Sequence, residues 1–214
     1  MRDTWLCVLA RDPSAAKTRL SGVLGQAARA DLAIAMLQDV LAAASEVPFA
    51  RRVVVTESEL VSRFARAAGA ESYYVSAAGT NEAASAATLA ATGGGAARVL
   101  LLAADLPYLL ASDLELLLRE EAHVVIAPDR HHRGTNALLL APPSVIQPAF
   151  GADSFRAHRE RAREASSVAR IVTSRGLAID VDERDDLRLL QTEPGLGRRT
   201  SDLLESVAFS AAIR

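Results

Sequence analysis

Three aspartates that lie in or after apolar runs are the residues of this chain most suited to chemistry. Asp105 ends one such run, and Asp180 and Asp182 alternate with Ile179 and Val181. In a β-strand this alternation places the two aspartates on one face and the two apolar side chains on the other. Two carboxylates ~4 Å apart repel each other by about 4 kcal/mol at an effective dielectric of ~20. A cation between them would offset that repulsion, and hard oxygen ligands suit magnesium.

These positions also have purely structural interpretations. Asp105-Leu106-Pro107 could simply form a turn, in which the aspartate caps a chain reversal and the proline fixes the next φ. Asp180 and Asp182 could lie on a solvent-facing edge or lead into a helix. The acidic residues at 183, 185 and 186 are best explained by the dipole of the helix that they begin. For Asp180 and Asp182, the alternating pattern favours a metal site.

A loop rich in cations follows the first apolar run. It carries Arg11, Lys17 and Arg19, and open α/β sheets bind ligands beyond the carboxyl ends of their strands. Neither G-x-G-x-x-G nor G-x-x-x-x-G-K-[ST] is present, so the loop is neither a dinucleotide fingerprint nor a P-loop. Its cations could clamp phosphates or could be solvated, and the segment alone does not decide between the two.

Two further segments are suited to anions. Arg133-Gly134-Thr135-Asn136 combines a hydroxyl group with a glycine that lets a ligand approach the backbone. Residues 150–155 begin a predicted helix, whose unpaired N–H groups attract a phosphate or carboxylate. Capping of this helix by Asp153 or Ser154 explains the segment equally well. Of the nearby histidines, 131 and 132 are interpreted as solvated and 158 stays ambiguous.

Composition excludes several classes of protein. Half of the 214 residues are apolar, which suits one α/β domain with a substantial core. The net charge is −2 and the basic residues form no stripe, which argues against nucleic acid and membrane partners. Cys7 lies in an apolar run and is interpreted as a buried hydrophobe rather than a nucleophile. No apolar stretch is long enough to span a bilayer and no signal-peptide layout is present, so we expect a cytoplasmic protein.

Short apolar runs alternate with longer helical patterns, which predicts an α/β fold with a mixed, mostly parallel sheet flanked by helices. We expect a single domain over residues 1–214, with 192–214 as a peripheral C-terminal tail. The predicted strands are Thr4–Leu9, Arg52–Thr56, Glu71–Val75, Val99–Leu102, Val124–Ala127, Asn136–Leu140 and Leu177–Val181. The predicted helices are Ala33–Ala44, Glu59–Ala68, Asn81–Ala91, Ser112–Glu120 with Ser112 as N-cap, Ser154–Ala165 and Arg184–Leu190.

Five segments, taken together, resemble the guanylyltransferase family of coenzyme F-420 biosynthesis, whose members act on 2-phospho-L-lactate, phosphoenolpyruvate or 3-phosphoglycerate. The matching stretches follow the family order: 16–21 (Ala-Lys-Thr-Arg-Leu-Ser), 104–107 (Ala-Asp-Leu-Pro), 127–138, 150–158 and 180–182. The resemblance implies a nucleotidyltransferase fold similar to glycosyltransferase type A domains. It therefore agrees with the alternating pattern of elements.

The resemblance also implies roles for individual residues. It implies that Mg²⁺ is held by Asp105, Asp180 and Asp182, and that catalysis involves Lys17, Arg19 and Asp105. For the nucleotide it implies Arg11, Lys17 and Asn81, and for the acceptor Thr135, Gly151 and Ser154. The chain departs from the family pattern at two places. Thr80 replaces the usual leucine before Asn81, and His131-His132-Arg133 leads into a single Gly-Thr that family members commonly repeat.

The implied reaction is attack by an acceptor phosphate oxygen on the α-phosphorus of GTP, with release of pyrophosphate. The Ala- and Arg-rich composition resembles high-GC bacterial members, which favours phosphoenolpyruvate over 2-phospho-L-lactate and 3-phosphoglycerate. A molybdenum-cofactor or sugar-phosphate nucleotidyltransferase is an alternative, although its L-A-x-G-x-x-x-R-M signature is absent after the first predicted strand. A catalytically silent binding module is another. A homodimer and a complex with the downstream transferase of the pathway stay open.

Overall fold

The computed structural model, which describes residues 3–76, 79–206 and 209, contains a seven-stranded sheet. The strands are β1 (Thr4–Leu9), β2 (Arg51–Thr56), β3 (Glu71–Tyr74), β4 (Arg98–Ala103), β5 (Val124–Pro128), β6 (Thr135–Leu140) and β7 (Ala169–Ile171). Their order across the sheet is β3-β2-β1-β4-β6-β5-β7. Strand β6 is antiparallel to β4 and β5, whereas the other pairs are parallel. This arrangement confirms the predicted fold class.

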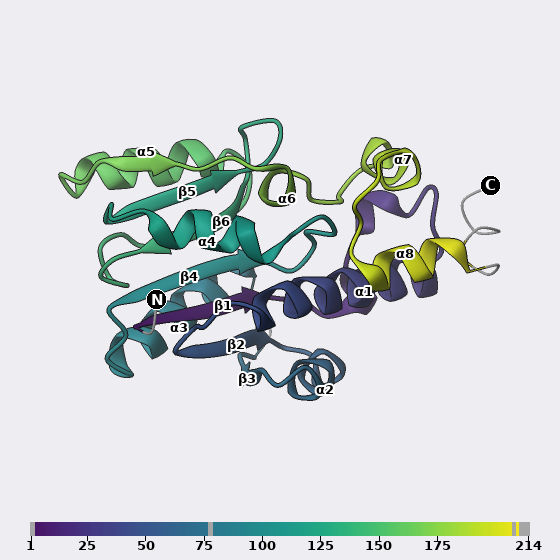
Figure 1. The fold of residues 1–214 in the computed structure, drawn as a ribbon, viewed down its shortest axis with the longest axis horizontal. Helices are drawn as coiled ribbons and strands as arrows, with labels where there is room; N and C mark the ends of the chain where they lie inside the picture. The colour runs from purple at the N-terminus through teal and green to yellow at the C-terminus, as the bar shows by residue number, and fades with distance from the viewer. Residues whose placement is uncertain (1–2, 77–78, 207–208, 210–214) are drawn as a thin grey trace.

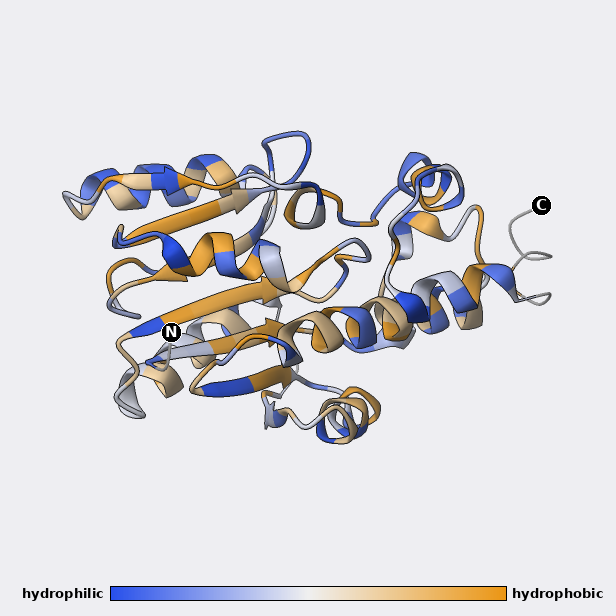
Figure 2. Cartoon of the chain, in the orientation of Figure 1, coloured by the Kyte–Doolittle hydropathy of each residue, from blue (hydrophilic) through white to orange (hydrophobic). Residues whose placement is uncertain are grey.

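Helices cover both faces of the sheet and make a three-layer structure (Figure 1). One face packs against α1 (Gln26–Ser45), α2 (Glu59–Ala67), α4 (Ala111–Arg119) and α6 (Arg175–Ala178), and the other against α3 (Thr80–Gly93) and α5 (Ser154–Glu164). Strand alternation explains the two cores, because Leu6 and Val8 face the first layer while Trp5 and Cys7 face the second. The central strands β1, β4, β5 and β6 are accordingly apolar along most of their length (Figure 2).

A third apolar cluster lies beyond the end of the sheet. It joins the first half of α1 to α7 (Arg184–Thr192) and α8 (Arg198–Glu205), and its buried members include Leu20, Met36 and Val181. Helix α8 lies alongside α1 (Figure 1). There the buried Asp39 accepts hydrogen bonds from the backbone N–H groups of Arg199 and Thr200, both at 2.8 Å. The described part of segment 192–214 is therefore anchored to the domain core.

Most predicted elements are confirmed, and two predictions are wrong. The predicted strand Leu177–Val181 does not exist, because Ser174 caps a short helix by accepting the N–H of Leu177 at 3.2 Å. The last strand of the sheet is instead β7 (Ala169–Ile171), which pairs with β5 on the side opposite β6. Ser112 is not an N-cap, because α4 begins at Ala111 and Asp113 accepts the Leu110 N–H at 2.8 Å. In the described residues, no helix is long and apolar enough to cross a membrane.

Candidate active site

A cleft of about 680 Å³ opens at the carboxyl ends of β1 and β4. These strands are parallel neighbours, but the chain continues from β1 to β2 on one side and from β4 toward β6 on the other. Connections that diverge in this way leave a crevice at the edge of an open α/β sheet. Its volume lies in the range of roughly 300–1,000 Å³ that small-molecule sites occupy. The fold therefore provides a ligand site where the cationic loop and Asp105 meet.

The loop after β1 is held in a defined shape. The Asp12 carboxylate accepts the N–H of Ser14 at 2.8 Å, and the N–H of Asp12 itself donates to Glu57 at 2.9 Å. Two short 3-10 turns follow, Pro13–Ala15 and Thr18–Leu20. Between them Lys17 adopts a left-handed backbone conformation with φ of 54°, which is uncommon for a residue other than glycine. This geometry lets the Lys17 side chain reach back toward the sheet.

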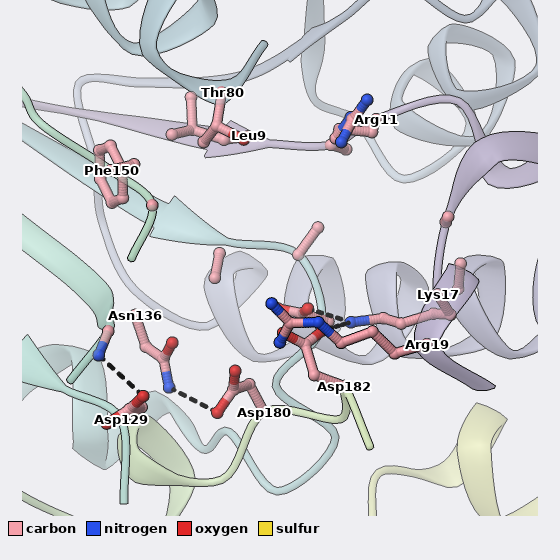
Figure 3. Close-up of a pocket in the computed structure, with 18 of the residues that line it drawn as sticks. Leu9, Arg11, Lys17, Arg19, Thr80, Asp129, Asn136, Phe150, Asp180 and Asp182 are labelled. Atoms are coloured by element: carbon pink, nitrogen blue, oxygen red, sulfur yellow. Dashed lines mark hydrogen bonds and ion pairs between the residues drawn. The ribbon is translucent and has the colours of Figure 1, made fainter. Parts of the chain in front are cut away.

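Lys17 forms ion pairs with two of the three predicted metal ligands (Figure 3). Its ammonium contacts Asp105 and lies 3.0 Å from Asp182. Burial alone would lower the pKa of Lys17, but the two carboxylates outweigh it and raise the pKa above its usual value. Arg19 lies 3.6 Å from Asp182 and is mostly exposed. Burial opposes ionisation of Asp182, but Lys17 and Arg19 hold its pKa below the usual value.

Asp180 is the acidic side chain that this cation does not neutralise. Burial, together with the negative charges of Asp105 and Asp182, raises the pKa of Asp180 to about 7. Its hydrogen-bond partner is the amide of Asn136, at 3.3 Å. Among the residues that the structure describes, no three Asp, Glu, His or Cys side chains form a ready-made metal site. The aspartates nevertheless supply hard oxygen donors and an unneutralised negative charge, which is chemistry that fits a divalent cation.

The segment that carries Asp180 and Asp182 is positioned by contacts outside the sheet. It runs between α6 and α7, and Val181 anchors it in the third apolar cluster. Asn136, at the start of β6, donates to the carbonyl of Leu177 at 3.0 Å as well as to Asp180. The two aspartates thus reach the cleft without being on a strand. The predicted alternation of buried and polar side chains holds in this extended segment, although the predicted sheet pairing does not.

Asp186 and Arg130 form a second support for this segment. Asp186 accepts the N–H groups of Asp182 and Glu183 at 2.8 and 2.7 Å, so it caps the start of α7. The same carboxylate forms an ion pair with the guanidinium of Arg130. The backbone N–H of Arg130 donates to the Ala178 carbonyl at 2.8 Å. The β5–β6 loop is therefore tied to the backbone of Asp182. In the sequence, the helix dipole alone explains Asp186 and nothing singles out Arg130, because their contact spans 56 positions that no local pattern relates.

The predicted acceptor residues line the other half of the cleft. Thr135 begins β6, and Gly151 and Ser154 lie where α5 begins, with the Ser154 side chain buried. Gly151 has φ of +122°, a conformation that favours glycine, and a Cβ there would meet no heavy atom within 4 Å. Asp153 is the residue before α5 and makes no side-chain capping bond. Capping therefore does not explain this segment in the described structure.

Asp129 shapes the loop that precedes Thr135. Its carboxylate accepts the N–H groups of His131, Arg133 and Gly134 at 2.8–3.0 Å. A Cβ on Gly134 would lie 2.9 Å from this carboxylate, which explains the glycine at that position. The Arg133 carbonyl in turn accepts the N–H of Phe155 at 3.0 Å and fixes the loop against α5.

Of the two remaining residues predicted to bind the nucleotide, Arg11 lines the cleft and Asn81 does not. Arg11 is exposed and lines the cleft just after β1. Asn81 is not among the lining residues, although Thr80 is. The Asn81 amide accepts the N–H of Phe150 at 2.6 Å and donates to the Phe150 carbonyl at 2.9 Å. This side chain thus clamps the backbone before Gly151, and a role in nucleotide binding stays a prediction.

Solved structures place this architecture among nucleotidyltransferase folds. A crystal structure from Desulfovibrio desulfuricans G20, assigned as a nucleotide-diphospho-sugar transferase, has a TM-score of 0.80 at 22% identity and covers 100% of this chain and 98% of that chain. A nucleotidyl transferase from Methanothermobacter has a TM-score of 0.65 at 12% identity and covers 87% of this chain and 95% of that chain. At these identities the likeness shows the fold alone. The chain therefore shares the α/β fold of these transferases.

Sequence comparison defines the family more closely. The family model described as "Guanylyl transferase CofC like" matches residues 7–214, and the chain belongs to this family. A phosphoenolpyruvate guanylyltransferase from Conexibacter woesei is 40% identical over 186 residues, which cover 82% of this chain and 82% of the relative. Further relatives are named for 3-phospho-D-glycerate at 33% identity and for 2-phospho-L-lactate at 30%.

Proposed function

We propose that the protein transfers GMP from GTP to the phosphate of phosphoenolpyruvate and releases pyrophosphate. Two observations support this proposal. The chain belongs to the guanylyltransferase family, and one cleft brings together Lys17, the aspartates and a separate half that is suited to anions. Relatives named for phosphoenolpyruvate, 34 to 40% identical to this chain, favour that acceptor. We further propose that the product enters coenzyme F-420 biosynthesis, as the family resemblance implies.

The chemistry requires positioning rather than a protein nucleophile. A phosphate oxygen of the acceptor forms a bond to the α-phosphorus of GTP, and the bond from that phosphorus to the α–β bridging oxygen breaks. The leaving group is pyrophosphate, and the acceptor phosphate is already anionic near pH 7, so no side chain has to remove a proton. Cys7, whose pKa burial raises to about 12, is unsuited to act as a nucleophile. Orientation and neutralisation of charge by the chain therefore carry the rate enhancement.

Lys17 and the aspartates would meet the phosphates of the nucleotide. Lys17 and Arg19 supply charge-assisted hydrogen bonds to phosphate oxygens, and we place Arg11 at the rim of the same half. We also propose that Mg²⁺ binds here, held by Asp105, Asp180 and Asp182, where the unneutralised charge of Asp180 supports a cation. Such an ion supplies Lewis-acid polarisation of phosphate oxygens. Before any ion binds, Asp105 and Asp182 hold the pKa of Lys17 above its usual value, so its ammonium is charged when the phosphates arrive.

The acceptor would lie against Thr135 and the start of α5. The positive end of a helix dipole attracts anions, and Ser154 begins the 11-residue helix α5. The glycine at 151 keeps this approach open, since no side chain projects from the backbone there. One half of the cleft would thus hold the triphosphate, and the other half would hold the small phosphorylated acid.

A pyrophosphate-release assay tests the function. Purified protein with Mg²⁺ and GTP is offered phosphoenolpyruvate, 2-phospho-L-lactate or 3-phosphoglycerate, and we expect the highest kcat/KM with phosphoenolpyruvate. Reactions without an acceptor and with ATP in place of GTP are the controls. Preference for another of the three acids would correct the acceptor alone. Absence of turnover with all three would refute the proposed reaction and favour a sugar-phosphate substrate or a silent binding module.

A further inference from the structure

The ring of His158 is completely buried between the two parts of the acceptor half. Its Nε2 atom lies 2.9 Å from the backbone nitrogen of Ala149, and its Nδ1 atom lies 3.0 Å from the hydroxyl oxygen of Thr135. The backbone N–H of Ala149 can only donate, so Nε2 must be the nitrogen that accepts. A neutral imidazole that accepts at Nε2 carries its proton on Nδ1. The contact with Ala149 therefore selects one tautomer.

This tautomer determines how the Thr135 hydroxyl can be used. The Nδ1–H group donates to the Thr135 oxygen, which leaves the hydroxyl proton of Thr135 available to another acceptor. Thr135 lines the cleft, so that acceptor would be a ligand there. Phosphate and carboxylate oxygens at neutral pH accept hydrogen bonds and do not donate them. With the opposite tautomer the threonine would donate to the ring and present lone pairs to an anion, which is unfavourable.

The surroundings keep the ring neutral. Burial, with a smaller contribution from the Arg161 charge, lowers the pKa of His158 to about 4.

The ring also holds the acceptor half together, because Ala149 directly precedes Phe150 and Gly151. The Phe150 ring meets the His158 ring edge-on at 5.2 Å, and the Asn81 amide holds the Phe150 backbone. One buried side chain thus contacts both β6 and the loop before α5.

We infer that His158 is a positioning residue that orients the Thr135 hydroxyl as a hydrogen-bond donor to an anionic group of the acceptor. The inference rests on the proposed function for the identity of the acceptor, but the tautomer itself does not depend on it. Nothing in this assignment requires His158 to touch the substrate. Its effect should appear in acceptor binding and should be transmitted through Thr135.

Nitrogen-15 NMR of protein labelled at histidine tests the tautomer directly. The chain has four histidines, and the spectrum of a His158→Asn variant identifies the signals of residue 158 by their loss. At pH 7 we expect a neutral ring with its proton on Nδ1, both without ligand and with phosphoenolpyruvate. A proton on Nε2, or a doubly protonated ring, would overturn the inference. This measurement stays decisive even if the protein proves inactive with all three phospho-acids.

A double-mutant cycle tests the transmission through Thr135. We expect Thr135→Val and His158→Phe each to raise the KM for the acceptor about tenfold or more, while the KM for GTP changes less than about twofold. The double variant should be no worse than Thr135→Val alone, because both changes remove the same hydrogen bond. Independent, multiplying effects would overturn the inference.

Conservative variants provide the matched controls. Thr135→Ser keeps the hydroxyl group, and His158→Asn keeps an amide donor near the position of Nδ1. Both should recover part of the acceptor KM relative to Thr135→Val and His158→Phe. If His158→Phe does not fold, His158→Asn and the NMR measurement still decide the question. No recovery in either conservative variant, in proteins with wild-type melting temperatures, would show a purely structural role.

Discussion

The ammonium nitrogen of Lys17 lies 3.0 Å from a carboxylate oxygen of Asp182, although 165 positions separate the two residues. The pair joins the loop after β1 to the segment between α6 and α7, and Asp105 at the end of β4 contacts the same ammonium. Three parts of the chain therefore meet at one cation. Substitutions among these residues should be strongly non-additive, because each changes the charge that the others experience.

Lys17→Ala should lower kcat/KM for GTP by roughly 10- to 100-fold. A charge-assisted hydrogen bond to a phosphate contributes about 1.5–3 kcal/mol, and about 1.4 kcal/mol corresponds to a factor of ten. Steady-state kinetics with varied GTP at saturating acceptor measures the effect. Arg188→Ala removes an exposed cation that pairs with Asp185 and serves as the matched control. Unchanged kinetics for Lys17→Ala would show that this lysine only stabilises the fold.

Asp180→Asn should lower the activity of the protein without lowering its stability. The change removes a proposed metal ligand and should lower kcat at least about 100-fold. It also removes a half-buried carboxylate whose pKa is raised to about 7 by its partial burial and by the neighbouring carboxylates, so the melting temperature should stay the same or rise. Asp105→Asn and Asp182→Asn should lose similar activity but also stability, because each leaves buried Lys17 with one carboxylate partner fewer.

Magnesium-dependent kinetics and thermal unfolding of the three variants check this prediction, with the exposed Asp185→Asn as control. Wild-type turnover of the Asp105 and Asp182 variants at saturating magnesium would contradict the proposed site. A marked loss of stability in Asp180→Asn would instead show that its carboxylate is neutralised in the folded protein.

Stability should decrease at acidic pH because of His158. Its folded-state pKa of about 4 lies below the unfolded value of 6.5, so the unfolded chain binds the proton first. The contribution is complete above about pH 6.5 and is lost progressively as the pH falls toward about 4, with a total of about 3 kcal/mol. Urea unfolding between pH 4 and 7 should show a shallower dependence in His158→Asn than in wild type. The same dependence in both proteins would exclude the effect, and His123→Ala, an exposed histidine, should match wild type.

Local patterns predicted most strands of the sheet, for a physical reason. Strand and helix periodicity depends on neighbours along the chain, and the continuous apolar run of β1 is visible in the sequence itself. The segment around Asp180 escaped this reasoning, because its partners Asn136 and Arg130 are distant in sequence. An extended run of alternating residues reads the same whether it pairs in a sheet or packs against loops.

The role of His158 could not be predicted from the sequence either. Its burial depends on packing of α5 against β6 and on the path of residues 149–151, which are separated along the chain. Asn81 shows the same limit, because its amide binds the Phe150 backbone across 69 positions. The nucleotide contact predicted there rests on the family resemblance. Side chains that support a site from behind give no signal in local spacing.

Gly151→Val should raise the KM for the acceptor more than the KM for GTP. The backbone at 151 has φ of +122°, which strains any side chain, and a Cβ there would project into open space where we place the acceptor. Gly151→Ala should have a smaller effect, because a methyl group fills less of that space. Gly93→Ala is the control, since its Cβ also meets no atom within 4 Å and no unusual φ is involved. Kinetics with each substrate varied in turn distinguish the outcomes. If the valine variant impairs GTP use and spares the acceptor, the two halves of the cleft have been assigned the wrong way round.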